Sequence, residues 1–326
     1  MSLPRLGCIG LLAFAWSAPG FADAYKAPRL SDGTPDLQGV WTNATATPME
    51  RPAEFGNRRA FTKEEADAIE REARGRVAED AAPSDPNKKI EAAKNLPPVG
   101  NYNLFWTDRG MTAALINGEY RTSMIIDPAN GRFPPLTEAA KKRPSTMRFG
   151  SDGPEQRSLG ERCLLSFGSS GGPPMLPTMY NSYYQIVQSP DHVMILVEMV
   201  HDARIIRIGG KHINGDVKKW MGDSVGKWEG DTLVVTTKNF RPDQSFRGAA
   251  ENLVVTERLT RVAQDQILYR FTIEDPTMFT APTTAELPFM AVDSSVYEYA
   301  CHEGNYALPG ILAAEREAEK AAAGKK

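Results

Sequence analysis

From residue 183 onward the sequence repeats one pattern, in which a short run of β-branched and aromatic residues is followed by a tight turn and another run. Ser189-Pro190-Asp191, Glu229-Gly230-Asp231 and Ala263-Gln264-Asp265 are turns of this kind. Turns this short join antiparallel neighbours, because a parallel crossover needs about a dozen residues or more. The repeated pattern therefore predicts a meander of antiparallel strands.

The predicted strands are numerous enough to close on themselves. They cover residues 38–42, 121–126, 183–188, 192–200, 203–208, 223–228, 232–238, 252–261, 266–274, 284–290 and 295–301. A series of strands without intervening helices closes most naturally into a barrel, which leaves no exposed edge. We predict a mainly β fold, an antiparallel up-and-down barrel of the lipocalin or calycin-like kind, with a few peripheral helices.

Side-chain alternation predicts which face of each strand is buried. In the strand 266–274, Tyr269 and Phe271 share one face, while Arg270 and Thr272 share the other. The strand 192–200 is apolar on both faces, so its outer side needs a cover. We expect that cover to come from the N-terminal part of the chain.

Three helices are predicted in the mature chain, two of them toward its ends. Thr62 and Glu65 form a capping-box pattern before an amphipathic helix at 63–79, Thr137 caps a brief helix, and a last helix begins near Leu308. We divide the chain into a signal peptide (1–24), an N-terminal wrap with one amphipathic helix (25–120), the antiparallel barrel (121–306) and a C-terminal helix and tail (307–326).

The first residues have the features of a cleavable leader. Arg5 is followed by an apolar run at 6–16 that is too short to span a bilayer, and Ala22-Asp23-Ala24 has small residues where a signal peptidase reads. We expect cleavage after Ala24 and a periplasmic or secreted protein.

Charge and hydropathy limit the partners. The formal net charge is −3, which argues against a nucleic-acid partner. No later segment is long and apolar enough to cross a membrane. We expect a small-molecule ligand or substrate, no cofactor and no metal, and the sequence leaves the oligomeric state open.

Two cysteines remain after the leader, Cys163 and Cys301. In a compartment where thiols oxidise, we expect them to form a disulfide. A disulfide would argue against a nucleophilic role for Cys301, which stands beside His302 and Glu303 in the segment Tyr-Glu-Tyr-Ala-Cys-His-Glu.

The stretch at 222–233, Gly-Asp-Ser-Val-Gly-Lys-Trp-Glu-Gly-Asp-Thr-Leu, is the most distinctive in the chain. Most of it is typical of a hairpin, with Gly230 at a position of positive φ and Trp228 filling a barrel end. Another segment, 149–177, is rich in Gly, Ser and Pro, and long loops of this kind usually cover something.

With these motifs the chain resembles a large family of exported bacterial proteins, most of them without an assigned activity. The resemblance rests on Asp-Leu-x-Gly-Val-Trp at 36–41, Arg-Cys at 162–163, Gly-Asp-Ser-x-Gly-x-Trp-Glu-Gly-Asp-Thr-Leu-Val-Val at 222–235 and Glu-Tyr-x-Cys-x-Glu at 298–303. It spans most of the mature chain. A broader similarity to calycin or lipocalin-like barrels is an analogy of fold, and such barrels host both carriers and cofactor-free enzymes.

Two other kinds of site have weaker patterns. Gly-x-Ser-x-Gly places Ser170 where a hydrolase nucleophile would stand, but Pro173-Pro174 follows, where that motif needs a helix. His201, His212 and His302 lack the close spacing of typical metal ligands, although the fold could bring them together.

General acid–base chemistry is the more economical use of the ionisable residues. His302 or Glu303, at the end of the strand 295–301, could point into the barrel mouth, where burial shifts a pKa. Glu198 lies within an apolar strand and needs a partner, for which Arg204 or Arg207 on the next strand is near. A buried structural pair explains Glu198 equally well.

These residues lead to one functional hypothesis and one alternative. We expect a cofactor-independent lyase, isomerase or hydrolase that acts on a small, largely apolar substrate inside the barrel. His302, Glu303 and Glu198 are the expected catalytic residues. Arg204, Trp228 and Tyr269 are the expected substrate contacts. The alternative is a non-catalytic small-molecule carrier that uses the same cavity.

Overall fold

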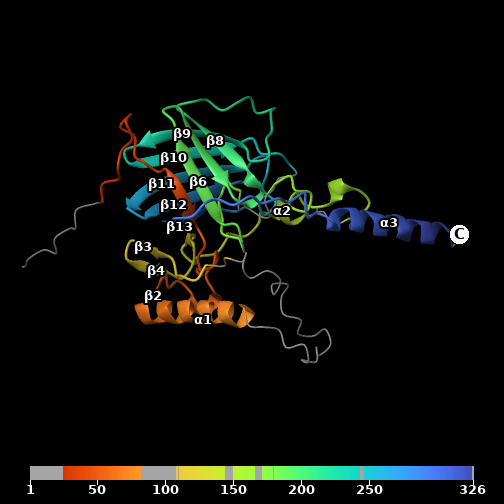
Figure 1. Cartoon of the computed structure of the whole chain (residues 1–326), viewed down its shortest axis with the longest axis horizontal. Coiled ribbons are helices and arrows are strands. Elements are labelled where there is room, and N and C mark those ends of the chain that lie inside the picture. Colours follow the sequence, from red (N-terminus) through yellow and green to blue (C-terminus); the bar gives the residue numbers. More distant parts are fainter. Residues whose placement is uncertain are drawn as a thin grey trace, which may run out of the picture.

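The computed structural model describes residues 25–81, 108, 110–143, 150–165, 171–178, 180–242 and 246–324. The predicted signal peptide and Ser170 lie outside these residues. Within them the protein is mainly β, with a barrel at one side and a smaller layer packed against it (Figure 1).

In the described part of the chain, nine strands close into a barrel, because β13 pairs back with β1. Their order around the barrel is β1-β6-β7-β8-β9-β10-β11-β12-β13. The bounds are β1 Gly39–Thr42, β6 Tyr183–Gln188, β7 His192–Val197, β8 Ala203–Ile208, β9 Asp223–Glu229, β10 Thr232–Lys238, β11 Val254–Ala263, β12 Gln266–Glu274 and β13 Thr283–Ala291. The closed, calycin-like barrel predicted from the turn pattern is confirmed.

One pairing departs from the predicted up-and-down topology. β8 and β9 are parallel, with Ile206 opposite Ser224 and Ile208 opposite Gly226, whereas the other barrel pairings are antiparallel. The connection 209–222 is long enough to carry the chain back along the barrel, as a parallel pairing requires. The barrel is therefore mixed, and the purely antiparallel prediction is wrong at this one junction.

The strand that closes the barrel comes from the N-terminal part of the chain, outside the predicted range 121–306. On β1, Trp41 faces the core and donates from Nε1 to the Leu37 carbonyl at 3.0 Å. β1 pairs with β6 on one side and β13 on the other. A further strand, β5 (Ile125–Asp127), pairs with β13 outside the closed ring.

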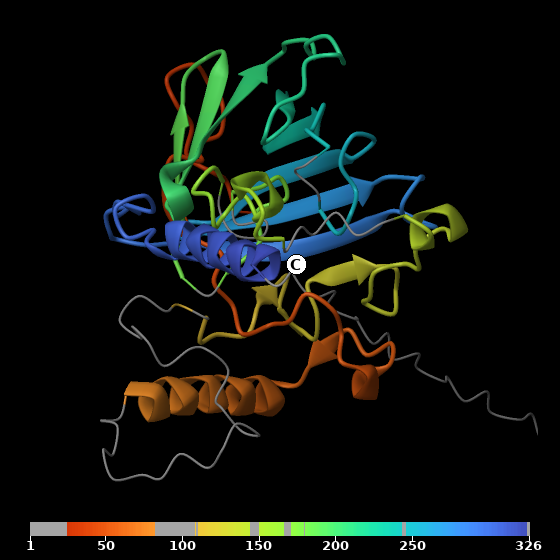
Figure 2. The same cartoon turned by 90° about the vertical axis from the view of Figure 1, so that its right-hand side faces the viewer.

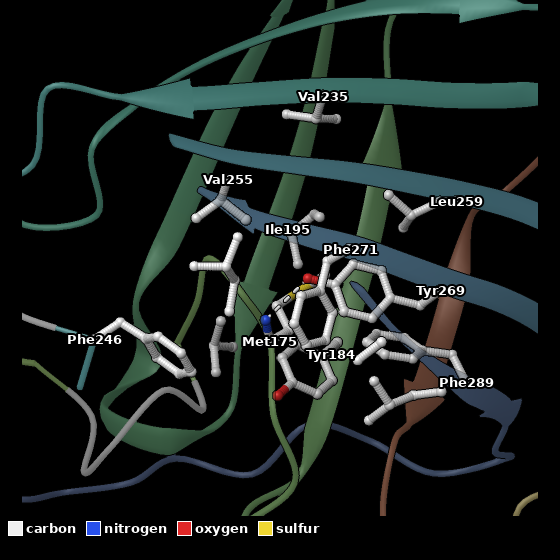
Figure 3. Packing of buried hydrophobic residues seen from close by; sticks show 14 of the residues in the cluster. Met175, Tyr184, Ile195, Val235, Phe246, Val255, Leu259, Tyr269, Phe271 and Phe289 are labelled. Atoms are coloured by element: carbon white, nitrogen blue, oxygen red, sulfur yellow. Dashed lines mark hydrogen bonds between the residues drawn. The ribbon is translucent and has the colours of Figure 1, made fainter. Parts of the chain in front are cut away.

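Inward-facing aromatic side chains make the centre of the barrel (Figure 3). Tyr269 lies between Phe271 and Phe289, with ring centroids 5.6 and 5.0 Å away, and Tyr184 lies 5.1 Å from Phe289. The alternation predicted for β12 is confirmed, since Tyr269 and Phe271 are buried and Arg270 is exposed. Met175 reaches the same cluster from the segment before β6.

A small second layer lies beside the barrel. It consists of a three-stranded sheet, β2 (Ala60–Phe61), β4 (Glu119–Arg121) and β3 (Leu115–Ile116), and of the helix α1 (Lys63–Ala81). The sheet lies between the barrel and α1 (Figures 1 and 2). The predicted capping box is present, because Glu65 Oε2 accepts from the Thr62 N–H at 2.8 Å and Thr62 Oγ1 accepts from the Glu65 N–H at 3.2 Å.

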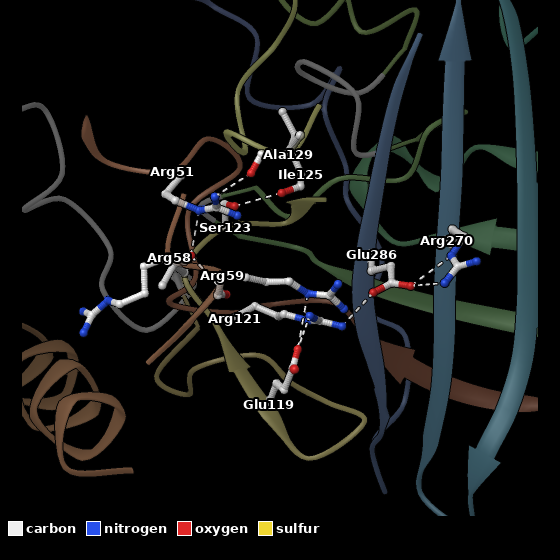
Figure 4. A network of polar contacts seen from close by, with 11 residues as sticks. Arg51, Arg58, Arg59, Glu119, Arg121, Ser123, Ile125, Ala129, Arg270 and Glu286 are labelled. Carbon is white, nitrogen blue, oxygen red and sulfur yellow. Dashed lines mark hydrogen bonds and ion pairs between the residues drawn. The ribbon is translucent and has the colours of Figure 1, made fainter. Parts of the chain in front are cut away.

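Buried charge joins this layer to the barrel (Figure 4). Arg121 donates from Nη2 to Glu286 Oε2 at 3.0 Å, and Arg270 donates from Nε to Glu286 Oε1 at 2.9 Å. Glu286 lies on the outer face of β13, so the N-terminal layer covers β13. We expected that cover over β7, but the outward side chains of β7 remain half-buried.

Four short helices and one long C-terminal helix complete the described elements. They are η1 (Ala53–Phe55), α2 (Glu138–Lys141), η3 (Pro154–Gln156), η4 (Met199–His201) and α3 (Ala307–Ala323). Thr137 caps α2 as predicted, with Oγ1 accepting from the Ala140 N–H at 3.0 Å. The last helix, α3, extends away from the barrel (Figure 1). Among the described helices, none has both the length and the apolar character that a membrane span requires.

The predicted strand 295–301 does not form. Beyond Ala291 the chain runs outside the barrel and turns at 301–304. β13 already pairs with β12 and β1, so no strand edge remains beside it for this segment. The predicted disulfide is present, and it joins Cys163 to Cys301 with a Cα–Cα distance of 5.7 Å.

Candidate ligand-binding site

A pocket of about 440 Å³ opens at one end of the barrel. Its walls combine apolar side chains, threonines and one arginine. The lining residues are Thr45, Thr47, Met49, Met124, Phe133, Leu176, Pro177, Thr178, Phe246 and Arg247.

Strand pairing brings these distant segments to the same end. Thr42, the last residue of β1, pairs with Tyr183, the first residue of β6. The segment that follows β1 and the segment that precedes β6 therefore meet, and each lines the pocket. The connection from β10 to β11 supplies Phe246 and Arg247 at this end. Leu176 and Pro177 belong to the Gly/Ser/Pro-rich segment.

Met175 holds this segment against the barrel core. Its N–H donates to Tyr269 Oη at 3.0 Å, and its carbonyl accepts from Asn43 Nδ2 at 3.3 Å. Its Sδ lies 3.7 Å from Arg204 Nη2. These contacts place Leu176 and Pro177, the next residues, at the inner wall of the pocket.

A buried ionic network lies beneath Met175. Arg204 on β8 pairs with both carboxylate oxygens of Glu257 on β11, and Tyr269 Oη donates to Glu257 Oε1 at 2.8 Å. Burial, together with the charge of Glu257, raises the pKa of Tyr269 well above its usual value, so Tyr269 stays a neutral donor. Burial by itself would lower the pKa of Arg204, but Glu257 more than offsets it, and the pKa is raised.

The threonine hydroxyls of the pocket wall are engaged by the backbone. Thr45 Oγ1 donates to the Thr112 carbonyl at 2.9 Å, and Thr178 Oγ1 donates to the Tyr180 carbonyl at 2.8 Å. Thr47 Oγ1 accepts from the Ala114 N–H at 2.9 Å. The wall therefore presents mainly hydrocarbon, thioether and aromatic surface to a ligand.

Among the described residues that line the pocket, Arg247 is the one with an ionisable side chain. Its guanidinium carbon lies 4.1 Å from the centroid of the Phe133 ring, in cation–π geometry. The ring of Phe133 in turn lies 6.1 Å from that of Phe246. Two aromatic side chains and one cation thus form one side of the pocket.

The predicted catalytic residues lie elsewhere in the structure. His302 and Glu303 are exposed in the turn that follows Cys301. Glu198 is buried, and its Oε1 accepts from the Tyr297 N–H at 3.2 Å. Burial raises the pKa of Glu198. None of the three is among the described pocket lining.

The predicted substrate contacts are also separate from the pocket. Arg204 and Tyr269 belong to the buried network with Glu257. Arg204, one of the two partners expected for Glu198, therefore pairs with Glu257. Trp228 packs against the core at the opposite end of the barrel, because it pairs with Leu233 near the start of β10. Gly230 has φ 60° in the β9–β10 turn, as predicted.

Asp223, in the stretch 222–233, holds a loop in place through its carboxylate. Asp223 accepts from Arg207 Nη1 and from the Ile213 N–H, both at 3.0 Å, and His212 Nδ1 lies 3.0 Å from its Oδ2. Burial by itself would raise the pKa of Asp223, but these hydrogen bonds hold it well below its usual range. Asp223 thus anchors the connection between the parallel strands β8 and β9.

Sequence reasoning missed the pocket residues for an identifiable reason. They come from segments between the strands, far apart in the chain, and only pairing of the barrel strands brings them together. No local signal marked the turn at Arg247-Gly248, because arginine stands where such turns usually have Asn, Asp or Gly.

A comparison of the sequence with models of known protein families and with curated proteins finds no match. The site itself therefore carries the argument for function.

Proposed function

We propose that the protein binds a small organic molecule with a largely apolar body in the pocket lined by the segment after β1, residues 176–178 and the β10–β11 connection. The observation that carries this proposal is the pocket of about 440 Å³ with its apolar wall. Ligand sites in proteins typically have volumes of about 300–1,000 Å³ and are lined by hydrophobic and aromatic side chains with few polar groups.

The wall chemistry favours binding over acid–base catalysis. A general acid or base has to lie within hydrogen-bond reach of the proton that it transfers. The described lining contains no carboxylate, imidazole, thiol, amine or phenol, and the guanidinium of its arginine has hydrogen-bond donors but no acceptor. Of the two functions considered from the sequence, the non-catalytic carrier is therefore better supported.

The proposal includes an oxidising location outside the cytoplasm, such as the periplasm. The leader-like residues 1–24 support it, and the Cys163–Cys301 disulfide is of the kind that persists where thiols oxidise.

A fluorescent apolar probe tests the proposal. N-Phenyl-1-naphthylamine gains fluorescence in an apolar environment, and we expect saturable binding of one molecule per chain. Met49→Trp should fill part of the pocket and weaken the affinity at least tenfold. Met111→Trp is the matched control, because Met111 is 45 % exposed and outside the lining, and it should leave the affinity unchanged.

Two results would contradict the proposal. One is the absence of saturable binding to the wild-type protein. The other is an equal affinity of Met49→Trp and wild type, which would place the probe outside the pocket.

A further inference from the structure

We infer that the ligand of this pocket carries an anionic group, such as a carboxylate, sulfonate or phosphate, and that Arg247 binds it at the pocket rim. This inference rests on the proposed binding function and adds the chemical class of the ligand.

The backbone at Arg247 is the first observation. Phe246 and Ala249 exchange two backbone hydrogen bonds, of 2.8 and 3.0 Å, around a two-residue turn. The residues between them, Arg247 and Gly248, have φ values of 52° and 90°. Positive φ at both central positions is typical of a type I′ turn, which favours Asn, Asp or Gly.

The same chain contains a second turn of this shape. Between β3 and β4, Ile116 pairs with Glu119 around Asn117 and Gly118, whose φ values are 51° and 78°. That turn has the residue pair that the backbone favours. The pocket turn has arginine where the other has asparagine. A long side chain in the left-handed region is unfavourable, and residues held there often have a functional role.

The charge of Arg247 is the second observation. Its side chain is exposed, and no carboxylate in the described part of the chain forms an ion pair with it. The Phe133 ring holds one face of the guanidinium, so the N–H groups at its edge can still donate. Planar donors of this kind suit carboxylate, sulfonate and phosphate groups.

The other side chains of the pocket wall indicate how the bound ligand is oriented. Thioether, aromatic and aliphatic side chains line the interior, whereas the cation stands in the exposed turn. A molecule with an apolar body and one anionic end would place the body in the pocket and the anion beside Arg247. A cationic end would be repelled there.

Two matched probes test the inference. 8-Anilinonaphthalene-1-sulfonate differs from N-phenyl-1-naphthylamine by one sulfonate. In the Arg247→Asn variant we expect the sulfonated probe to bind roughly tenfold more weakly, whereas the uncharged probe should change less than twofold. The substitution copies the Asn117-Gly118 turn, so the melting temperature should not fall. Arg132→Gln removes a nearby exposed charge that does not line the pocket, and it should change neither affinity.

Salt gives a second readout. The affinity of wild type for the sulfonated probe should fall as ionic strength rises, and this dependence should weaken in Arg247→Asn. If both probes bind wild type but Arg247→Asn affects them equally, the anion assignment is wrong while the pocket remains. If neither probe binds wild type, the proposed function fails first and the assignment fails with it.

Discussion

Arg204 and Glu257 form an ion pair inside the barrel, with Arg204 Nη2 3.0 Å from Glu257 Oε1 and both side chains at most 3 % exposed. They lie on β8 and β11, which are not neighbours in the sheet. Tyr269 donates to the same carboxylate and accepts from the Met175 N–H. The pair therefore ties together two sides of the barrel and the segment that leads to the pocket.

Removing one partner of this pair should destabilise the protein more than removing both charges. We expect Glu257→Gln to lower the free energy of unfolding by about 3–5 kcal/mol, because Arg204 is left buried without a counter-ion. The double variant Arg204→Met/Glu257→Gln should recover a large part of this loss, while the amide oxygen introduced at position 257 can still accept from Tyr269. Urea unfolding of wild type, Arg204→Met, Glu257→Gln and the double variant measures the coupling, and a double variant as unstable as the sum of the two single variants would refute it.

Glu198 should make stability fall as the pH rises. Burial raises its pKa, so the native state holds the proton more tightly than the unfolded state does. Its contribution is present below the ordinary Glu value of 4.5 and is lost as the pH rises through the folded pKa. Glu198→Gln should therefore melt higher than wild type at about pH 8, and the gain should shrink as the pH approaches 4.5.

The same variant separates structure from catalysis. If Glu198 is the catalytic partner predicted from the sequence, the substitution should abolish turnover of a substrate. A stabilised variant that binds N-phenyl-1-naphthylamine like wild type is the outcome that we expect. Melting curves recorded across the pH range, together with the probe titration, check both points.

The contribution of Asp223 to stability should depend on pH in the opposite direction to that of Glu198. Its pKa is lowered in the folded state, so its contribution is present above the ordinary value of 3.8 and is lost as the pH falls through the folded pKa. Asp223→Asn should lower the free energy of unfolding by about 2–4 kcal/mol at neutral pH, because Arg207 loses its buried partner. The difference from wild type should narrow under acid conditions.

The loop that Asp223 anchors gives an independent readout. Limited proteolysis should cut the connection 209–222 faster in Asp223→Asn than in wild type. Asp216→Asn is the matched control, since Asp216 is exposed on the same connection. Equal protease resistance of Asp223→Asn and wild type would contradict the anchoring role.

The disulfide should stabilise the protein through the length of the loop that it closes. Cys163 and Cys301 are separated by 138 positions, for which the chain-entropy model gives a contribution of about 5 kcal/mol. We expect the Cys163→Ser/Cys301→Ser variant to unfold at lower urea concentration, with a loss of about 3–5 kcal/mol. Wild type under reducing conditions is the comparison, and unchanged unfolding in both samples would show that the crosslink contributes nothing.

Local chemistry in the sequence determined much of the fold. Alternation of side chains placed Tyr269 and Phe271 inside, the glycine at 230 marked a hairpin, and Thr62 with Glu65 marked the start of α1. Each of these depends on neighbours a few residues apart. The pairing of the cysteines was predicted from the expected oxidising compartment, and the disulfide is present, while export itself stays a prediction.

The tertiary structure alone decided the parallel β8–β9 junction, the closing strand β1 and the pocket. The segment 295–301 reads as a strand by itself, yet β13 has no edge left to pair with it. Arg247 shows the same limit for the site, because neither its left-handed backbone conformation nor its contact with Phe133 is visible in the sequence. Backbone conformation and alternation depend on nearby residues, but strand partners and pocket walls depend on which distant segments pack together, and packing is a property of the whole chain.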